Sequence, residues 1–128
     1  MKIAFVGNMN NNNFAMMRYF RDLGADAHLL LCKNDGAGSL AHFRPEFDTW
    51  ELEKWSEYIH ELTFDNSSTA VIGNPLKLKF PPKRKKMKQQ LLGYDIYIGN
   101  GASPAIFNRL RLPLTVFYPY ATGIEPVA

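Results

Sequence analysis

The sequence has 128 residues, of which 46% are hydrophobic and 21% are charged, and its formal net charge is +3 at pH 7. This balance is typical of one globular domain with its own core, and it excludes a chain that is disordered throughout. The single cysteine, Cys32, excludes a disulfide within the chain, and no apolar run reaches the roughly 18 residues of a membrane-spanning helix. We therefore expect a soluble, cytoplasmic protein with the Cys32 thiol buried in the apolar run 29–32.

The first 32 residues predict a strand, a helix and a second strand. Residues 2–7 form an apolar run that ends in glycine, and residues 27–32 form another. Between them an apolar helical face recurs with helical spacing, and Gly24 stands where a helix-ending glycine belongs. Two strands joined through a helix are parallel, with a right-handed crossover. The predicted apolar face consists of Met16, Tyr19, Phe20 and Leu23.

The middle of the chain is less regular. Residues 33–47 contain glycines and a proline and predict a long loop. Asp48 marks a helix start, and the spacing of the apolar residues Leu52, Trp55, Ile59 and Leu62 predicts that this helix continues to Leu62. Residues 70–72 are a candidate short strand, and residues 83–92 predict a helix that Gly93 ends.

The last third predicts a strand at 95–98, a helix that begins at Ser103-Pro104, and a strand at 114–118. Ser103 is expected to cap that helix with its hydroxyl. Alternating strands and helices predict an α/β fold with an open, parallel, doubly wound, Rossmann-like sheet and helices on both faces. We expect one domain over residues 1–128.

Ligands of such sheets bind outside the carboxyl ends of the strands. Three segments occupy those positions: 7–13, 99–103 and 119–125. They are rich in small and hydrogen-bonding residues, which suit sugar hydroxyls or phosphate oxygens. The candidate binding residues are Gly7, Asn8, Asn10, Gly99, Asn100, Gly101, Ser103, Tyr120, Thr122 and Glu125.

Structural alternatives exist for each of these residues. The asparagines can cap a helix, the glycines can supply positive φ angles in a turn, and Ser103 has no histidine nearby in sequence that would activate it as a nucleophile. The first loop lacks the glycine spacing of a dinucleotide site, so we expect no nicotinamide cofactor. The catalytic residues are left open.

The three histidines do not predict a metal site. His28 lies in a predicted strand, His60 in a predicted helix and His42 in the long loop. No pair has the spacing of metal ligands, so we expect no metal and no other cofactor. Of the three, only His42 lies where it could take part in chemistry.

A basic segment covers residues 77–88, with seven basic residues and no acidic one, so the charge of +3 leaves −4 for the rest of the chain. One interpretation is a solvated helix surface; another is attraction to anionic lipid headgroups. Nucleic acid is a weaker candidate, because no aromatic platform accompanies the cations. The proposed membrane-facing residues are Lys83, Arg84, Lys85, Lys86 and Lys88.

The segment LLGYDIYIGNGASPAIFNRLRLPLTVFYPYATGIEP resembles the N-terminal domain of glycosyltransferases with the two-domain GT-B fold. The opening MKIAFVGN and the segment YFRDLGADAHLLL are similar to the first strand–helix–strand unit of that family. The likeness covers roughly residues 1–32 and 91–126. One departure is Tyr118-Pro119-Tyr120, which stands where the family often has a histidine.

The resemblance implies transfer of a sugar from a nucleotide sugar to an acceptor, with the acceptor held by this domain. It also implies that residues 1–128 are an incomplete acceptor-side domain, inactive alone, which lacks the nucleotide-binding half and whose exposed cleft favours a homo-oligomer. Two alternatives remain: a non-catalytic domain that binds a small ligand or regulates a partner, and a module that binds anionic membranes through the basic segment.

Overall fold

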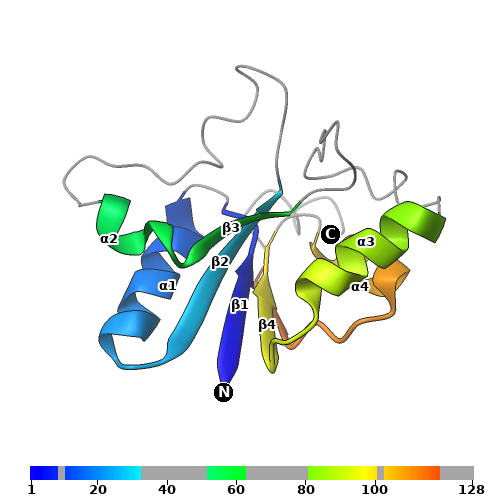
Figure 1. Cartoon of the computed structure of the whole chain (residues 1–128). Helices are drawn as coiled ribbons and strands as arrows, with labels where there is room; N and C mark the ends of the chain where they lie inside the picture. Colours follow the sequence, from blue (N-terminus) through cyan, green and yellow to red (C-terminus); the bar gives the residue numbers. More distant parts are fainter. Residues whose placement is uncertain (9–10, 33–51, 63–80, 101–102, 119–128) are drawn as a thin grey trace.

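The computed structural model describes residues 1–8, 11–32, 52–62, 81–100 and 103–118. The elements in chain order are β1 (Lys2–Val6), α1 (Asn12–Asp22), β2 (Asp26–Cys32), α2 (Leu52–Ser56), β3 (Ile59–Leu62), α3 (Pro81–Leu91), β4 (Ile96–Gly99), α4 (Ser103–Leu110) and β5 (Val116–Phe117). The five strands form one sheet in the order β3-β2-β1-β4-β5, and every pairing is parallel. The predicted α/β fold, a parallel Rossmann-like sheet in a single small domain, is confirmed (Figure 1).

The central strand β1 explains the stability of the sheet. Four of its five residues are buried, and Phe5 pairs with Leu29 of β2 on one side and with Ile98 of β4 on the other. Burial on both faces requires an apolar side chain at nearly every position of the strand, which is why residues 3–6 are a continuous apolar run. The four strands predicted from the sequence lie side by side as expected.

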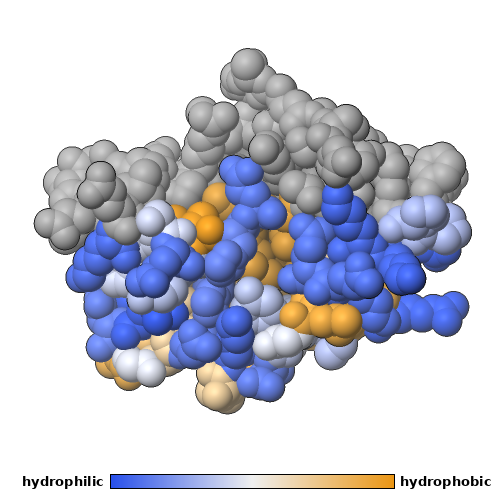
Figure 2. Space-filling view, viewed as in Figure 1, coloured by the Kyte–Doolittle hydropathy of each residue, from blue (hydrophilic) through white to orange (hydrophobic). Residues whose placement is uncertain are grey.

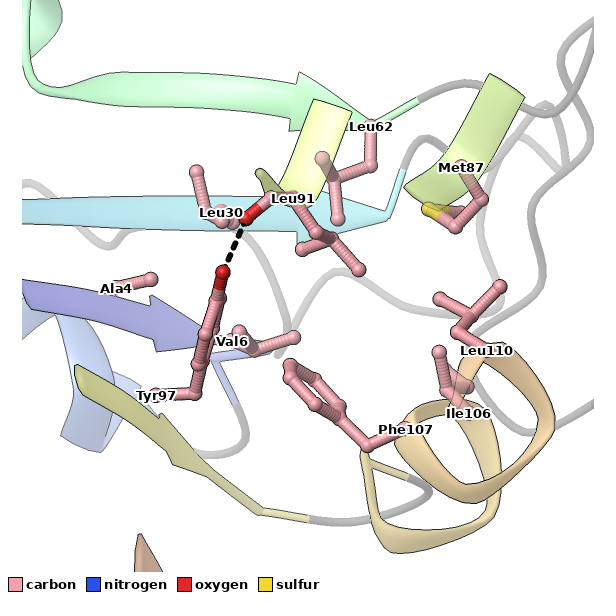
Figure 3. Close-up of a cluster of buried hydrophobic side chains, with 10 residues drawn as sticks. All are labelled: Ala4, Val6, Leu30, Leu62, Met87, Leu91, Tyr97, Ile106, Phe107 and Leu110. Carbon is pink, nitrogen blue, oxygen red and sulfur yellow. Dashed lines mark hydrogen bonds between the residues drawn. The ribbon is translucent and has the colours of Figure 1, made fainter. Parts of the chain in front are cut away.

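Successive side chains of the strands alternate between two cores, one on each face of the sheet. Ile3, Phe5, Ala27 and Leu29 pack with residues of α1 and with Trp55 of α2. The opposite face packs against α3 and α4, where the buried Tyr97 hydroxyl donates a 2.5 Å hydrogen bond to the Leu91 carbonyl (Figure 3). This core consists of Ala4, Val6, Leu30, Leu62, Met87, Leu91, Tyr97, Ile106, Phe107 and Leu110.

The buried face of α1 is different from the predicted one. Of the four predicted residues, Phe20 packs partly buried against the core as expected, but Met16, Tyr19 and Leu23 are 39%, 63% and 85% exposed. Phe14 and Met17 are fully buried instead. The helix is rotated because the polar Asn13 points into the domain and bonds to backbone carbonyls of the β1 end. A hydropathy pattern assigns asparagine to the surface, so it cannot predict this rotation.

The prediction that the second helix continues to Leu62 is also wrong. The helix α2 ends at Ser56, the Tyr58 N–H bonds to the Trp55 carbonyl, and the chain continues as β3. In this conformation the Leu29 N–H bonds to the Tyr58 carbonyl, so β3 satisfies the free edge of β2. Tertiary pairing therefore overrides a spacing that fits a helix.

Other boundaries agree with the predictions or differ slightly. Gly24 and Gly93 end their helices with φ of +84° and +97°, as expected of glycines at helix ends. Strand β5 is shorter than predicted, with two residues. The predicted loop 33–47, its His42, the candidate strand 70–72 and the Cys32 side chain lie outside the described residues. Within the described part of the chain, no helix is long and apolar enough to cross a membrane.

Candidate functional site

The strand order places a change of direction between β1 and β4. From β1 the chain adds β2 and then β3 on one side, and it later returns to add β4 and β5 on the other side. The connections that leave the carboxyl ends of β1 and β4 therefore diverge, and open parallel sheets bind their ligands at such a point. Residues 6–8 and 99–100 lie at this position.

Gly7 brings the two strand ends together. Its φ is +83°, and a Cβ atom at this position would lie 2.9 Å from Oδ1 of Asn100. The Gly7 N–H donates a 2.9 Å hydrogen bond to the Leu30 carbonyl and extends the pairing with β2. Glycine is therefore required both by its backbone angle and by the close approach of the Asn100 amide.

Gly99 permits a similarly close approach between the end of β4 and the start of α4. A Cβ on Gly99 would lie 2.6 Å from the Ser103 Cβ, and the Ser103 hydroxyl oxygen would be its closest neighbour. The Ser103 N–H bonds to the Asn100 carbonyl at 3.2 Å. The absence of a side chain on Gly99 thus lets α4 begin directly against β4.

Two buried polar groups at this point have no hydrogen-bond partner among the described residues. Asn100 is 4% exposed and Ser103 is 3% exposed, and neither the Asn100 Nδ2 nor the Ser103 Oγ has a partner within the described residues. A buried donor without a partner costs about 1–3 kcal/mol, so such groups are rare unless they serve a function. The expected helix cap at Ser103 is wrong: this residue is the first of α4, and its hydroxyl lies against Gly99 instead.

Asn8 lies beside these groups but is occupied. It is fully buried, its Oδ1 accepts a 2.8 Å hydrogen bond from the Phe14 N–H, and its Nδ2 donates to Asn11 Oδ1 at 3.3 Å. Asn11 precedes α1 with a φ of 63°. The structural alternative for Asn8, binding a free N–H of the first helical turn, is therefore observed.

Asn13 is a buried polar residue that the sequence did not single out. Its Nδ2 donates to the carbonyls of Val6 and Gly7 at 3.1 and 2.7 Å, and its Oδ1 accepts from the Tyr118 hydroxyl. One side chain therefore joins β1, α1 and the end of β5. The run of asparagines at 10–13 was the available signal, but it could not show which asparagine points inward.

The structure brings five of the predicted binding residues to one edge of the sheet: Gly7, Asn8, Gly99, Asn100 and Ser103. Residues that bind a ligand at an open sheet edge are expected to be partly accessible to solvent, but Asn8 and Asn100 are both buried. The reason is the tight approach of the two strand ends and the use of Asn8 to hold α1. The remaining predicted residues, Asn10, Gly101, Tyr120, Thr122 and Glu125, lie outside the described residues.

The two helices that begin at this sheet edge bring no acidic charge to it with their first turns. Neither α1 nor α4 has an acidic residue in its first turn. In the ranges that the structure describes, no three His, Cys, Asp or Glu side chains gather closely enough to hold a metal ion. The site thus offers hydrogen bonds from neutral groups.

The basic segment ends in α3, which carries no acidic residue. Met87 and Leu91 face the core and are fully buried, Lys85 is exposed, and Arg84, Lys86 and Lys88 are half-buried. Two further arginines, Arg109 and Arg111, are exposed at the end of α4. Figure 2 shows a hydrophilic surface over α3. The side chain of Lys83 lies outside the described residues.

Comparison with protein-family models, with curated proteins and with solved structures finds no match.

Proposed function

We propose that the crevice between the ends of β1 and β4 binds a small hydroxyl-bearing ligand. The observation that carries this proposal is a pair of buried polar groups, the Asn100 Nδ2 and the Ser103 Oγ, for which the described residues supply no hydrogen-bond partner. An amide N–H donates, and a hydroxyl both donates and accepts. A ligand hydroxyl also does both, so it complements this pair.

A free phosphate fits the site less well. Phosphate sites at helix starts use several backbone N–H groups. Here the Phe14 N–H of α1 already bonds to Asn8, and Pro104 in the first turn of α4 has no N–H to give. Neutral hydroxyl groups are therefore the better match.

The more specific proposal is that this ligand is the acceptor of a sugar transfer. Residues 91–126 carry the likeness to GT-B glycosyltransferases, and the same stretch supplies β4, α4 and β5 beside the crevice. In this proposal another domain or subunit binds the nucleotide sugar, and the present domain orients the acceptor. Orientation of two reactants can contribute about 7–11 kcal/mol to a reaction. The alternative is a non-catalytic domain that uses the same crevice for a regulatory ligand.

The test is binding to the ¹⁵N-labelled chain, with hexoses, hexose phosphates and nucleotide sugars as probes. We expect a hydroxyl-rich probe to shift the amide signals of Gly7, Gly99 and Ser103. Asn100→Ala should weaken binding by about three- to tenfold, as expected for one net hydrogen bond. The matched control is Asn108→Ala, which changes an exposed asparagine on α4. Equal affinity of both variants, or shifts confined to other parts of the sheet, would exclude this crevice.

Turnover separates the enzyme from the regulatory domain. If the chain supports sugar transfer when a nucleotide-binding domain is added, and Asn100→Ala lowers that rate, the acceptor role holds. If the chain binds a ligand tightly but supports no transfer in any combination, the regulatory alternative holds.

A second candidate function is binding to an anionic membrane surface. The cations of α3 and Arg109 of α4 occur on helices without a single acidic residue, and Arg111 directly follows α4. Among the described residues none of these cations forms an ion pair. Each basic residue near an anionic surface contributes about 1 kcal/mol. An acceptor that lies in a membrane would connect this function with the first.

A further inference from the structure

Three polar side chains, those of Asp26, His28 and His60, form a continuous hydrogen-bonded network across β2 and β3. Asp26 Oδ1 lies 2.9 Å from His28 Nε2, and His28 Nδ1 lies 2.8 Å from His60 Nε2. The two imidazole rings stack with centroids 5.1 Å apart and an angle of 25°. The sequence could not predict this pair, because it placed His60 on a helix.

The Asp26 carboxylate determines which nitrogen atoms of the network carry protons. At neutral pH Asp26 can only accept, so His28 donates from Nε2 and keeps a lone pair at Nδ1. His60 must then donate from Nε2 to that lone pair, which leaves its own Nδ1 as an acceptor. His60 is exposed, whereas the His28 side chain is only 12% exposed. The hydrogen-bonded network therefore ends in an accessible basic nitrogen, Nδ1 of His60.

Charged groups of two other elements, α1 and β1, lie near this network. Arg21 of α1 lies 3.3 Å from Asp26 Oδ1 and donates a 2.9 Å hydrogen bond to the Ala27 carbonyl. Lys2 of β1 contributes a second positive charge.

Two tyrosine rings pack edge-on against His28, that of Tyr58 at 6.0 Å and that of Tyr94 at 5.7 Å. Their hydroxyls are neutral at physiological pH, since burial raises the pKa of Tyr94 and a hydrogen bond with Glu57 raises the pKa of Tyr58. The titratable and charged groups around the histidine pair are thus Lys2, Arg21, Asp26, Glu57, Tyr58 and Tyr94.

These surroundings keep both histidines neutral at pH 7. Burial lowers the pKa of His28, and the charges of Lys2 and Arg21 act in the same direction against the opposing effect of Asp26. Burial likewise lowers the pKa of His60, with further contributions from His28 and Lys2.

We propose that the Asp26–His28–His60 network is a pH-dependent clasp, a set of hydrogen bonds that holds β3 to β2. The clasp stays intact when it takes up one proton, and it opens when it takes up a second. The first proton binds His60 Nδ1, and the Nε2 proton of His60 passes to His28 Nδ1. His28 is then an imidazolium that donates to both Asp26 and the neutral His60. A second proton can bind only at His60 Nε2, the atom that now accepts from His28. The hydrogen bond breaks, and two stacked cations repel each other.

The effect of opening falls on β3, because among the described strands β3 pairs with β2 alone. It lies at the end of the strand order within the described part of the sheet, and of its four residues only Leu62 is buried. Its backbone pairs with β2 from Leu29↔Ile59 to Cys32↔Leu62. When the clasp opens, β3 should separate from β2 before the central strands β1 and β4 separate.

The first test is ¹⁵N NMR of the imidazole rings in the whole chain. We expect His28 and His60 at about pH 7.5 to carry their protons at Nε2, and both to titrate in two coupled steps below the ordinary histidine range. Two independent titrations at the ordinary histidine pKa of 6.5 would overturn the proposal. This measurement uses the unmodified protein, so it does not depend on the folding of a variant.

The second test is amide hydrogen exchange at about pH 7.5 and about pH 5, corrected for intrinsic rates. Protection of the Ile59–Leu62 amides should fall by about two- to tenfold at the lower pH, as expected for one net hydrogen bond, while β1 stays protected. His60→Gln should remove this pH dependence, and Glu61→Gln on the same strand should keep it. A uniform loss over all strands, or the same loss in His60→Gln, would contradict the clasp.

Discussion

The hydroxyl of Tyr118 donates a hydrogen bond to Oδ1 of Asn13, a residue 105 positions earlier in the chain. The same Asn13 side chain donates from Nδ2 to the carbonyls of Val6 and Gly7. The end of β5 is therefore tied to the start of α1 and to the end of β1 through one buried amide. This junction lies at the carboxyl end of β1, beside the candidate site.

Tyr118→Phe should destabilise the protein by about 1–3 kcal/mol, because it leaves the buried Asn13 oxygen without this donor. The measurement is urea unfolding with unchanged m-value. Tyr19→Phe is the matched control, since Tyr19 is 63% exposed, and it should change the stability little. Equal effects of the two substitutions would show that the Tyr118 bond does not contribute.

Gly7→Ala should destabilise the protein more than Gly24→Ala does. Both glycines have positive φ, +83° and +84°, so both substitutions strain the backbone. Only at Gly7 would the new Cβ meet another atom, Asn100 Oδ1 at 2.9 Å, whereas nothing lies within 4 Å at Gly24. We expect about 1 kcal/mol for the backbone strain at each position and a further loss at Gly7. Asn100→Ala in the Gly7→Ala background should recover that further loss.

The sequence predicted the sheet because its signals there are local. A continuous apolar run such as 2–7 and a helix-ending glycine such as Gly24 each have one dominant structural meaning. The candidate binding residues that the structure describes lie at one sheet edge for the same reason, since the carboxyl ends of parallel strands share an edge.

The failures occurred where tertiary contacts, rather than the local hydropathy pattern, decide the structure. Residues 59–62 form a strand because the edge of β2 accepts them, and no pattern within those residues shows this. The burial of Asn8 and Asn13 depends on carbonyl and amide groups of β1 and α1 that only the fold brings together. The His28–His60 contact depends on both effects.

Binding to acidic vesicles should depend on the cations of α3. Replacing Lys83, Arg84, Lys85 and Lys86 with glutamine should abolish co-sedimentation at low salt, because about four contributions of about 1 kcal/mol each are lost. Met87 and Leu91 hold the helix to the core and stay unchanged, so the unfolding midpoint should not move. Arginine at the three lysine positions is the control that preserves charge, and it should keep binding. Absence of vesicle binding by the unmodified chain would leave α3 as a solvated surface.

The free energy of unfolding should fall as the pH drops below about 6.5. The pKa values of His28 and His60 are lowered in the folded state from 6.5, so the unfolded chain takes up more protons on acidification. The stabilisation by the neutral histidines is complete above the unfolded pKa and is lost as the pH falls through the lowered folded values. Urea midpoints measured against pH should show this slope, and the double variant His28→Gln/His60→Gln should flatten it. An equal slope in the double variant would assign it to other groups.

Ser103→Ala distinguishes a helix cap from a ligand-binding hydroxyl. A capping serine contributes about 1 kcal/mol, so its loss would destabilise the protein. The Ser103 hydroxyl is buried against Gly99 and has no hydrogen-bond partner among the described residues, so its removal relieves an unsatisfied polar group. We therefore expect Ser103→Ala to leave the stability unchanged or to raise it by up to about 1 kcal/mol, while affinity for a hydroxyl-bearing ligand falls. Urea unfolding and titration of the labelled chain measure the two effects on the same sample. If Ser103 binds ligand at the expense of stability, its removal should lower the affinity and should not lower the stability. A loss of both affinity and stability would therefore identify Ser103 as a structural residue.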